Sequence, residues 1–146
     1  MSKSRLSRSA FTLIELIVVV VILAILALVV APRILGRAED ARVSSAITTI
    51  RAFDNALELY NADTGKYPTT DQGLAALVTN PGVPNWKGPY LKNQDKVPPD
   101  PWGHPYRYKQ PGESNRDYDL SSDGPDGQPS TDDDIQGWNL QKQSGS

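Results

Sequence analysis

The sequence predicts an α+β fold, in which one long N-terminal helix packs on a small antiparallel β-sheet. An apolar run over residues 11–31 leads directly into an amphipathic stretch that continues to about residue 61. Two short stretches with alternating side chains, residues 106–109 and 118–121, follow a segment rich in proline and glycine. A helix-period pattern followed by strand-period patterns is typical of this fold class.

The first 32 residues divide into a basic leader and an apolar segment. The leader, residues 1–10, contains Lys3, Arg5 and Arg8 and no acidic residue. As a helix rising about 1.5 Å per residue, the apolar run would be roughly 31 Å long, which matches a hydrocarbon core of about 30 Å. Because the positive charges precede the run, we expect a transmembrane helix with a cytoplasmic N-terminus and the remaining chain on the opposite side.

Glu15 places a carboxylate inside this apolar run. A charge within a membrane helix costs about 2.5–3.5 kcal/mol on insertion scales, so it indicates a functional role. A secretory signal peptide explains the segment less well, because its apolar core is usually about 7–15 residues long and a small-residue cleavage signal follows it. Glu15 therefore favours a helix that meets a partner within the membrane.

The junction Ala10-Phe11-Thr12-Leu13-Ile14-Glu15 resembles the processing motif of type IV pilins and type II secretion pseudopilins. The resemblance implies that a prepilin peptidase cleaves between Ala10 and Phe11 and that the new amino terminus on Phe11 is methylated. It also implies that Glu15 neutralises the amino terminus of a neighbouring subunit, since opposite charges attract strongly at low dielectric. The family usually has glycine before the cleavage site, so Ala10 predicts slower cleavage.

The amphipathic part of the helix is expected to bury one stripe of side chains. Its members recur every three or four residues: Val43, Ile47, Ile50, Phe53 or Asp54, Leu57 and Tyr60. Gly65 predicts the end of the helix. Thr69 and Gln72 have capping-box spacing, which predicts a short helix over residues 70–79 that buries Leu74, Leu77 and Val78.

Residues 80–105 are predicted to form a long loop because proline and glycine recur throughout. Trp86, Tyr90 and Trp102 are interpreted as packing anchors of this loop. His104 is a poor candidate for zinc, because it is the one histidine and the chain has no cysteine. Without a paired base and nucleophile we expect no enzymatic activity, and without a basic patch we expect no nucleic-acid partner.

Residues 117–134 contain seven aspartates and no lysine or arginine. A solvated acidic loop is the simpler interpretation of such a run. However, Gly124, Pro125 and Gly127 predict tight turns that bring acids back onto acids, which is repulsive without a counterion. A hard cation with 6–8 oxygen ligands suits this arrangement, although the spacing is not that of an EF-hand.

Three further segments resemble the major pseudopilin of type II secretion, the general secretion pathway protein G family: YPTTDQGL at 67–74, DPWG at 100–103, and GPDG followed by DDI at 124–135. The resemblance implies a calcium loop. Its ligands would be the side chains of Asp126, Asp133 and Asp134 and the backbone carbonyls of Asp123 and Thr131. Calcium would stabilise the domain where related proteins use disulfides, and Trp138 would pack the end of the loop onto the domain.

The sequence thus predicts a cleaved leader at 1–10, a transmembrane and assembly helix at 11–32, a periplasmic domain at 33–140 and a flexible tail at 141–146. The family resemblance implies a homopolymeric, periplasmic pseudopilus that drives export of folded proteins through the outer membrane. Its implied partners are minor pseudopilins, an inner-membrane assembly platform, the peptidase that also methylates, and inner-membrane lipid. Two alternatives remain: a type IV pilin, disfavoured by the absence of cysteine, and a membrane-tethered calcium-binding domain that does not polymerise.

Overall fold

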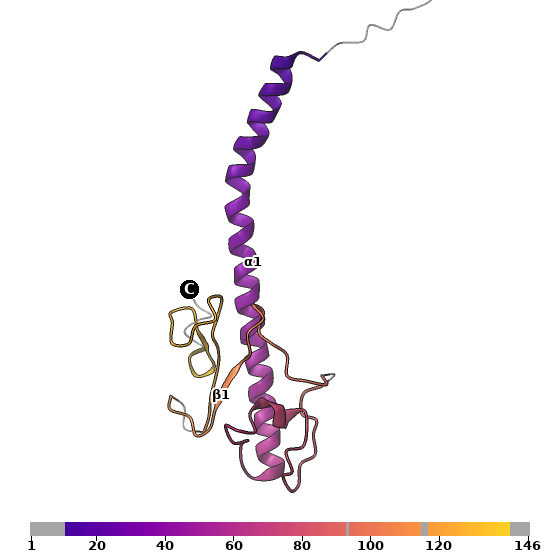
Figure 1. Ribbon diagram of the computed structural model, residues 1–146, viewed down its shortest axis with the longest axis vertical. Helices are drawn as coiled ribbons and strands as arrows, with labels where there is room; N and C mark the ends of the chain where they lie inside the picture. Colours follow the sequence, from indigo (N-terminus) through magenta and orange to yellow (C-terminus); the bar gives the residue numbers. More distant parts are fainter. Residues whose placement is uncertain (1–10, 93, 115–116, 141–146) are drawn as a thin grey trace, which may run out of the picture. The chain divides into compact units, whose positions relative to one another are not determined.

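The computed structural model describes residues 11–92, 94–114 and 117–140, apart from the side chains of residues 28–35. The elements in chain order are α1 (Leu13–Thr64), the 3-10 helix η1 (Leu74–Leu77), β1 (Arg107–Lys109), β2 (Asp119–Ser122), β3 (Ile135–Gln136) and the 3-10 helix η2 (Gly137–Asn139) (Figure 1). The chain divides into two compact units, residues 1–39 and 40–146. The predicted leader and tail lie outside the described residues.

The N-terminal unit begins α1 with a side-chain cap. The Thr12 hydroxyl accepts a hydrogen bond from the Glu15 amide at 3.3 Å, and the Thr12 carbonyl accepts one from the Leu16 amide at 3.2 Å. This is the geometry of an N-cap residue, with the acid three positions later near the positive end of the helix dipole. Within the described residues, no helix combines the length and the apolar character that crossing a membrane requires. The predicted span also includes residues 28–31, whose side chains lie outside the description.

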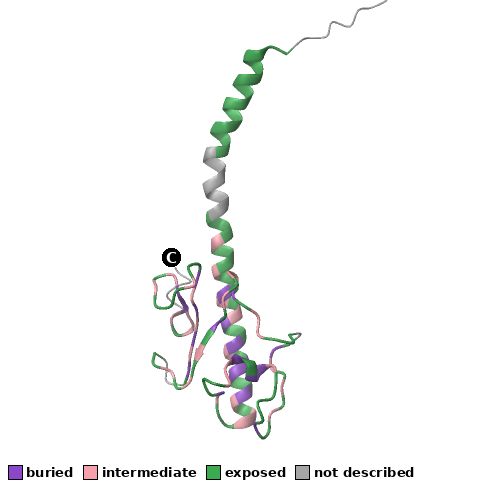
Figure 2. Ribbon diagram, viewed as in Figure 1, coloured by how far each residue is buried: buried purple, intermediate pink, exposed green. Residues whose placement is uncertain are grey.

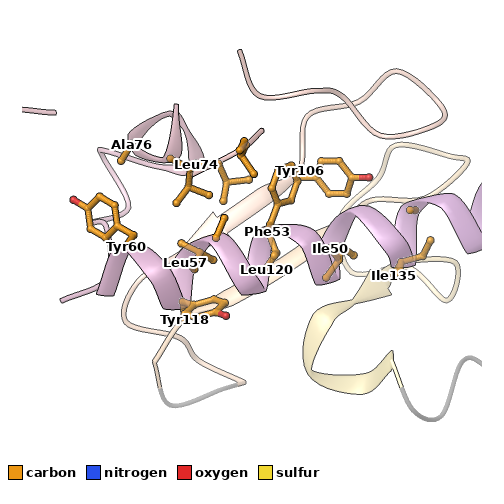
Figure 3. Close-up of a cluster of buried hydrophobic side chains, with 14 of the residues drawn as sticks. Ile50, Phe53, Leu57, Tyr60, Leu74, Ala76, Tyr106, Tyr118, Leu120 and Ile135 are labelled. Atoms are coloured by element: carbon orange, nitrogen blue, oxygen red, sulfur yellow. The ribbon is translucent and has the colours of Figure 1, made fainter. Parts of the chain in front are cut away.

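The second unit is built on one face of α1 after residue 40. As predicted, the stripe is buried at Ile50, Phe53, Leu57 and Tyr60 (Figures 2 and 3). The sequence left open whether Phe53 or Asp54 belongs to the stripe. Phe53 is the buried residue, at 1% exposed, whereas Asp54 is half-buried. The ring of Phe53 meets that of Tyr106 edge to face, with 5.0 Å between centroids. This arrangement joins the helix to the segment that enters β1.

The end of α1 is confirmed at the predicted glycine. Gly65 has a φ of +79°, and its amide donates to the Asn61 carbonyl at 2.8 Å. A left-handed residue after the last helical turn satisfies a terminal carbonyl, and glycine adopts this conformation without steric cost.

The sheet has three antiparallel strands in the order β1-β2-β3. Tyr108 pairs with Leu120, and Ser122 pairs with Ile135. The first two strands were predicted, whereas β3 was missed because two residues are too few to show an alternating pattern. Leu120 and Ser122 are buried and their neighbours in β2 are half-buried, so one face of the sheet completes the core.

A pair of tyrosine–carboxylate hydrogen bonds links α1 to the chain around the sheet. The Tyr118 hydroxyl donates to Asp54 Oδ1 at 3.0 Å, and the Tyr67 hydroxyl donates to Glu58 Oε1 at 2.8 Å. Burial raises the pKa of Asp54, the hydrogen bond from Tyr118 lowers it, and the nearby charge of Glu58 raises it. Asp54 therefore depends on Tyr118 to stay ionised in a partly desolvated position.

The helix predicted over residues 70–79 is shorter than expected, and only η1 forms. The capping-box bonds are present, from the Thr69 amide to Gln72 Oε1 at 2.9 Å and from the Gln72 amide to Thr69 Oγ1 at 3.3 Å. Gly73 then adopts a φ of +56°, which breaks the right-handed helical path. Leu74 and Leu77 are buried as predicted, whereas Val78 is half-buried.

The long loop is held by the aromatic residues that the sequence singled out. Trp86 Nε1 donates to the Ala76 carbonyl at 2.9 Å, and its ring meets Tyr90 edge to face at 5.7 Å. The Tyr90 hydroxyl in turn donates to Asp63 Oδ2 on α1 at 3.1 Å. Lys92 and residues 94–96 are exposed between these anchors and the turn at Asp100.

Candidate calcium loop and assembly helix

The acidic loop turns back on itself at two glycines. Gly124 and Gly127 have φ values of +64° and +63°. A Cβ atom on Gly124 would lie 2.4 Å from the carbonyl oxygen of Asp133. The backbone at Gly124 thus approaches Asp133 more closely than any other residue type allows, and this contact brings the two ends of the loop together.

Three predicted ligand side chains meet around one hydroxyl. Thr131 Oγ1 lies 2.7 Å from Asp133 Oδ1, 3.3 Å from Asp134 Oδ1 and 3.4 Å from Asp126 Oδ1. The same hydroxyl is 3.0 Å from the Gln128 carbonyl. A threonine hydroxyl has a single hydrogen to donate. Four acceptor oxygens therefore share the one proton of this hydroxyl.

Backbone amides provide further donors to these carboxylates. The Asp126 amide donates to Asp133 Oδ2 at 3.2 Å, and the Ser130 amide donates to Asp134 Oδ2 at 2.8 Å. The pKa of Asp133 is lowered first by the Thr131 hydroxyl, with desolvation opposing and the Asp126 amide adding to the effect. The loop thus holds Asp133 in its ionised form.

The backbone carbonyl ligands remain predictions. The carbonyl of Thr131 accepts from the Asp134 amide at 3.4 Å, and the side chain of Asp123 pairs with Arg107 Nη1 at 3.3 Å. Among residues 11–92, 94–114 and 117–140, no group of three or more histidine, cysteine, aspartate or glutamate side chains is placed to hold a metal ion. The hydroxyl of Thr131 was not predicted as part of the cluster, although a threonine two residues before Asp133 could have indicated it.

The chemistry of the cluster fits a hard cation. All its members present oxygen atoms, three of them are carboxylates, and these three gather around the hydroxyl of Thr131. Calcium is bound by carboxylate and carbonyl oxygens, six to eight at a time, in flexible geometry. The donor set is therefore suitable for calcium and unsuitable for a soft metal.

Trp138 is only partly covered at the end of the loop. Its side chain is 38% exposed, while Leu140, at 8%, takes the buried position. Trp138 instead borders a groove of about 620 Å³ that runs from the outer face of the sheet to the acidic loop. Trp138 lies in η2 and also borders a smaller pocket beside Tyr118 and Leu120.

The assembly residues lie at the start of α1. Phe11 is 78% exposed and precedes the Thr12 cap, and Glu15 is in the first helical turn. Ala10 lies outside the described residues. The large apolar side chains of residues 11–26 are each at least 45% exposed. An unpaired helix that is apolar on nearly all sides requires cover from another apolar surface.

Comparisons with known proteins identify both ends of the molecule. A family model for the prokaryotic N-terminal methylation motif matches residues 5–31, and the model for type II secretion system protein G matches residues 33–138. The chain is 45% identical to type II secretion system core protein G of Aeromonas hydrophila over 145 residues, covering 96% of this chain and 97% of that protein. The corresponding protein of Vibrio cholerae is 46% identical over 147 residues, with 97% and 98% covered.

Structural similarity agrees. The major pseudopilin from the type 2 secretion system of enterohaemorrhagic Escherichia coli has a TM-score of 0.62 and 37% identity, covering 73% of this chain and 94% of that one. The fold is thus the α+β fold of pilin-like proteins, as predicted. The chain belongs to the type II secretion system protein G family and is a pseudopilin subunit. This family is structural, and its members work within a multi-subunit assembly.

Proposed function

We propose that the subunit polymerises into a periplasmic pseudopilus whose growth drives folded proteins through the outer membrane. Residues 11–32 would anchor it in the bacterial inner membrane with the N-terminus cytoplasmic, and residues 33–140 would lie in the periplasm. The supporting observation is the apolar surface of residues 11–26, interrupted by Glu15. Lipid would cover this surface before assembly, and neighbouring copies would cover it within the filament.

Processing between Ala10 and Phe11 is compatible with the start of the helix. The cap that begins α1 uses Thr12, and its two hydrogen bonds go to the Glu15 and Leu16 amides. Removal of the leader therefore leaves these bonds intact. The new amino group on Phe11 would carry a positive charge close in sequence to Glu15, and this charge would pair with Glu15 of an adjacent subunit.

Replacing Glu15 tests this assembly mechanism. The chain has no native cysteine, so a single cysteine in place of Leu16 can report contact between copies through disulfide cross-linking. We expect Glu15→Ala to reach the membrane but to lose cross-linked multimers, while Asp40→Ala, at an exposed acid on the same helix, keeps them. Normal multimers in Glu15→Ala would refute charge pairing, and monomers in the unmutated background would indicate a tethered domain that does not polymerise.

We further infer that the acidic loop binds calcium through Asp126, Asp133 and Asp134, with the carbonyls of Asp123 and Thr131. Bound calcium would supply the positive charge that the hydroxyl of Thr131 cannot. The geometry that supports this is the sharing of one proton among four oxygens. A loop closed by a cation would take the stabilising role of a disulfide in a chain without cysteine.

Thermal unfolding of the full chain in detergent tests the metal. Added Ca²⁺ should raise Tm and a chelator should reverse the rise, because binding to the folded state shifts the unfolding equilibrium. Asp133→Asn should abolish the calcium-dependent rise, whereas Asp117→Asn, at an exposed acid outside the cluster, should retain it. A Tm that is insensitive to Ca²⁺ in the unmutated chain would exclude a calcium loop.

A further inference from the structure

The turn at residues 100–104 is organised by a buried carboxylate. The side chain of Asp100 is 0% exposed. Its Oδ1 atom accepts hydrogen bonds from the amides of Trp102 at 3.1 Å and His104 at 2.8 Å. The other oxygen, Oδ2, accepts from the hydroxyl of Ser122 at 2.6 Å. Both oxygens of Asp100 are therefore used, one within its own turn and one on the end of β2.

Ser122 passes this connection to the acidic loop. Its side chain is 0% exposed, and its hydroxyl accepts a hydrogen bond from the Gly124 amide at 3.2 Å. A serine hydroxyl has one hydrogen, and here it is directed to Asp100 because a carboxylate cannot donate. The lone pairs of Ser122 are then available to Gly124. The carboxylate thus fixes the direction of the relay as well as the position of the hydroxyl.

His104 holds the same glycine from its other side. Its Nδ1 atom lies 3.2 Å from the Gly124 carbonyl oxygen, which only accepts, so Nδ1 carries the hydrogen in this bond. The imidazole also lies against Gly127, where a Cβ atom would be 2.7 Å from its Cε1. The turn at 100–104 therefore contacts both glycines of the acidic loop.

The position of Gly124 controls the spacing of the acidic cluster. Gly124 packs against the backbone of Asp133. Asp126 follows Gly124 by two residues, and its amide donates to Asp133 Oδ2 at 3.2 Å. A shift of Gly124 would therefore disturb its contact with Asp133 and the nearby bond from the Asp126 amide to Asp133. Ligands that are held in place before binding pay a smaller entropic cost when the metal arrives.

We propose that Asp100 is a positioning residue for the cation loop, acting through Ser122 and supported by His104. This inference rests on the proposed binding of calcium. It gives a role to the DPWG turn, which lies 20 residues or more before Asp123, the first proposed ligand in the sequence, and contributes no oxygen ligand. Residues that orient metal ligands from outside the coordination sphere typically affect metal affinity by roughly 10- to 100-fold.

Two substitutions separate positioning from general stability. Asp100→Asn preserves shape and the Oδ1 acceptor but replaces Oδ2 with a donor, so the relay through Ser122 is reversed. Ser122→Ala removes the relay, and Ser122→Thr restores a hydroxyl. Asp95→Asn, at an exposed acid in the preceding loop, is the control. All variants are prepared as the full chain in detergent, and Ca²⁺ affinity is measured by calorimetry.

We expect Asp100→Asn and Ser122→Ala each to weaken Ca²⁺ binding by roughly 10- to 100-fold, with Ser122→Thr recovering most of the loss. Asp100 and Ser122 act through the same hydrogen bonds to Gly124. The double variant should therefore bind Ca²⁺ no more weakly than whichever single variant binds it more weakly. Unchanged affinity in both single variants would refute the proposal. If Asp100→Asn does not fold, Ser122→Ala and its threonine rescue give the same decision.

Hydrogen exchange without calcium provides an independent readout. The Gly124 amide should exchange faster in Ser122→Ala than in the unmutated chain, as seen in a peptide covering residues 120–128, while peptides from α1 remain unchanged. An unaltered exchange rate at Gly124 would refute the positioning role. If the unmutated chain binds no Ca²⁺ but Gly124 exchange still responds, the calcium proposal fails and the structural relay stands.

Discussion

The hydrogen bond from Tyr118 to Asp54 gives the most direct test of how the sheet is held on the helix. Tyr118→Phe removes the hydroxyl and leaves the ring, which meets Tyr67 with 5.0 Å between centroids. A hydrogen bond to a charged group contributes about 1.5–3 kcal/mol, and the partial exposure of Asp54 favours the lower end of that range. We therefore expect Tyr118→Phe to lose about 1.5–2 kcal/mol of unfolding free energy at pH 7.

The expected loss depends on pH in a defined direction. The pKa of Asp54 is already raised by burial, so the folded chain binds its proton more readily than the unfolded chain, and this residue destabilises the fold as pH rises. Removing the Tyr118 hydroxyl raises that pKa further. The difference between the variant and the parent should be greatest well above the pKa of folded Asp54 and should shrink as pH falls towards the usual value of 3.8.

Tyr60 provides a matched control for this measurement. Its hydroxyl is buried and has no hydrogen-bond partner within the described chain, so Tyr60→Phe removes the same atom without breaking a bond. We expect a change within about 0.5 kcal/mol, or a gain, since an unsatisfied buried hydroxyl is costly. The unfolding free energies of Tyr118→Phe and Tyr60→Phe are measured at pH 7 and pH 4 by urea unfolding of the full chain in detergent, with tryptophan fluorescence as the signal. The interpretation is wrong if Tyr118→Phe loses no more than Tyr60→Phe.

Four further outcomes are expected. Phe53→Ala should cost about 3–5 kcal/mol in urea unfolding, because it empties a fully buried position; a loss below about 1 kcal/mol would contradict the core assignment. Gly124→Ala should make the acidic loop far more sensitive to protease, whereas Gly65→Ala should have a smaller effect at the end of the helix. Both glycines have a positive φ, but an added Cβ at Gly65 would have no atom within 4 Å. Equal sensitivity of the two sites would contradict this. The pKa of Asp133 is lowered in the folded chain, so its ionised form contributes stability above pH 3.8, and this stability is lost as pH falls through the folded pKa. Asp133→Asn should therefore reduce the fall of Tm at acidic pH. An unchanged fall of Tm would argue against this role of Asp133. Mass spectrometry of membrane-extracted protein should find Phe11 at the N-terminus with one added methyl group, and an intact leader in mature protein would exclude the processing scheme.

The helix was predictable because its signals repeat. Apolar residues spaced three or four apart over five turns define a buried face whichever surface covers it, and the glycine stop needs only local backbone geometry. The third strand carried no such signal. The helix predicted over residues 70–79 failed for a different reason: its capping box is real, but Gly73 leaves the helical conformation immediately afterwards. Local capping cannot by itself determine how far a helix extends.

For the acidic loop, the sequence pattern predicted that acids are brought together but not what lies between them. The turns at Gly124 and Gly127 are local features, so the return of acids onto acids could be predicted, whereas the choice of Asp126, Asp133 and Asp134 came from the family resemblance. The pairing of Asp123 with Arg107 comes from the register of β1 against β2. The contact of Ser122 with Asp100 joins residues 22 positions apart. Such contacts depend on tertiary structure, which single-sequence patterns do not specify.

The exposed residues between the aromatic anchors and Asp100 have a practical use. A short reporter peptide placed between Gln94 and Lys96 would lie outside the bonds made by Trp86, Tyr90 and Asp100. Subunits tagged at this position would allow the location of the subunit to be followed in living cells by light microscopy. Tags at the N-terminus would be lost with the leader if cleavage occurs as proposed.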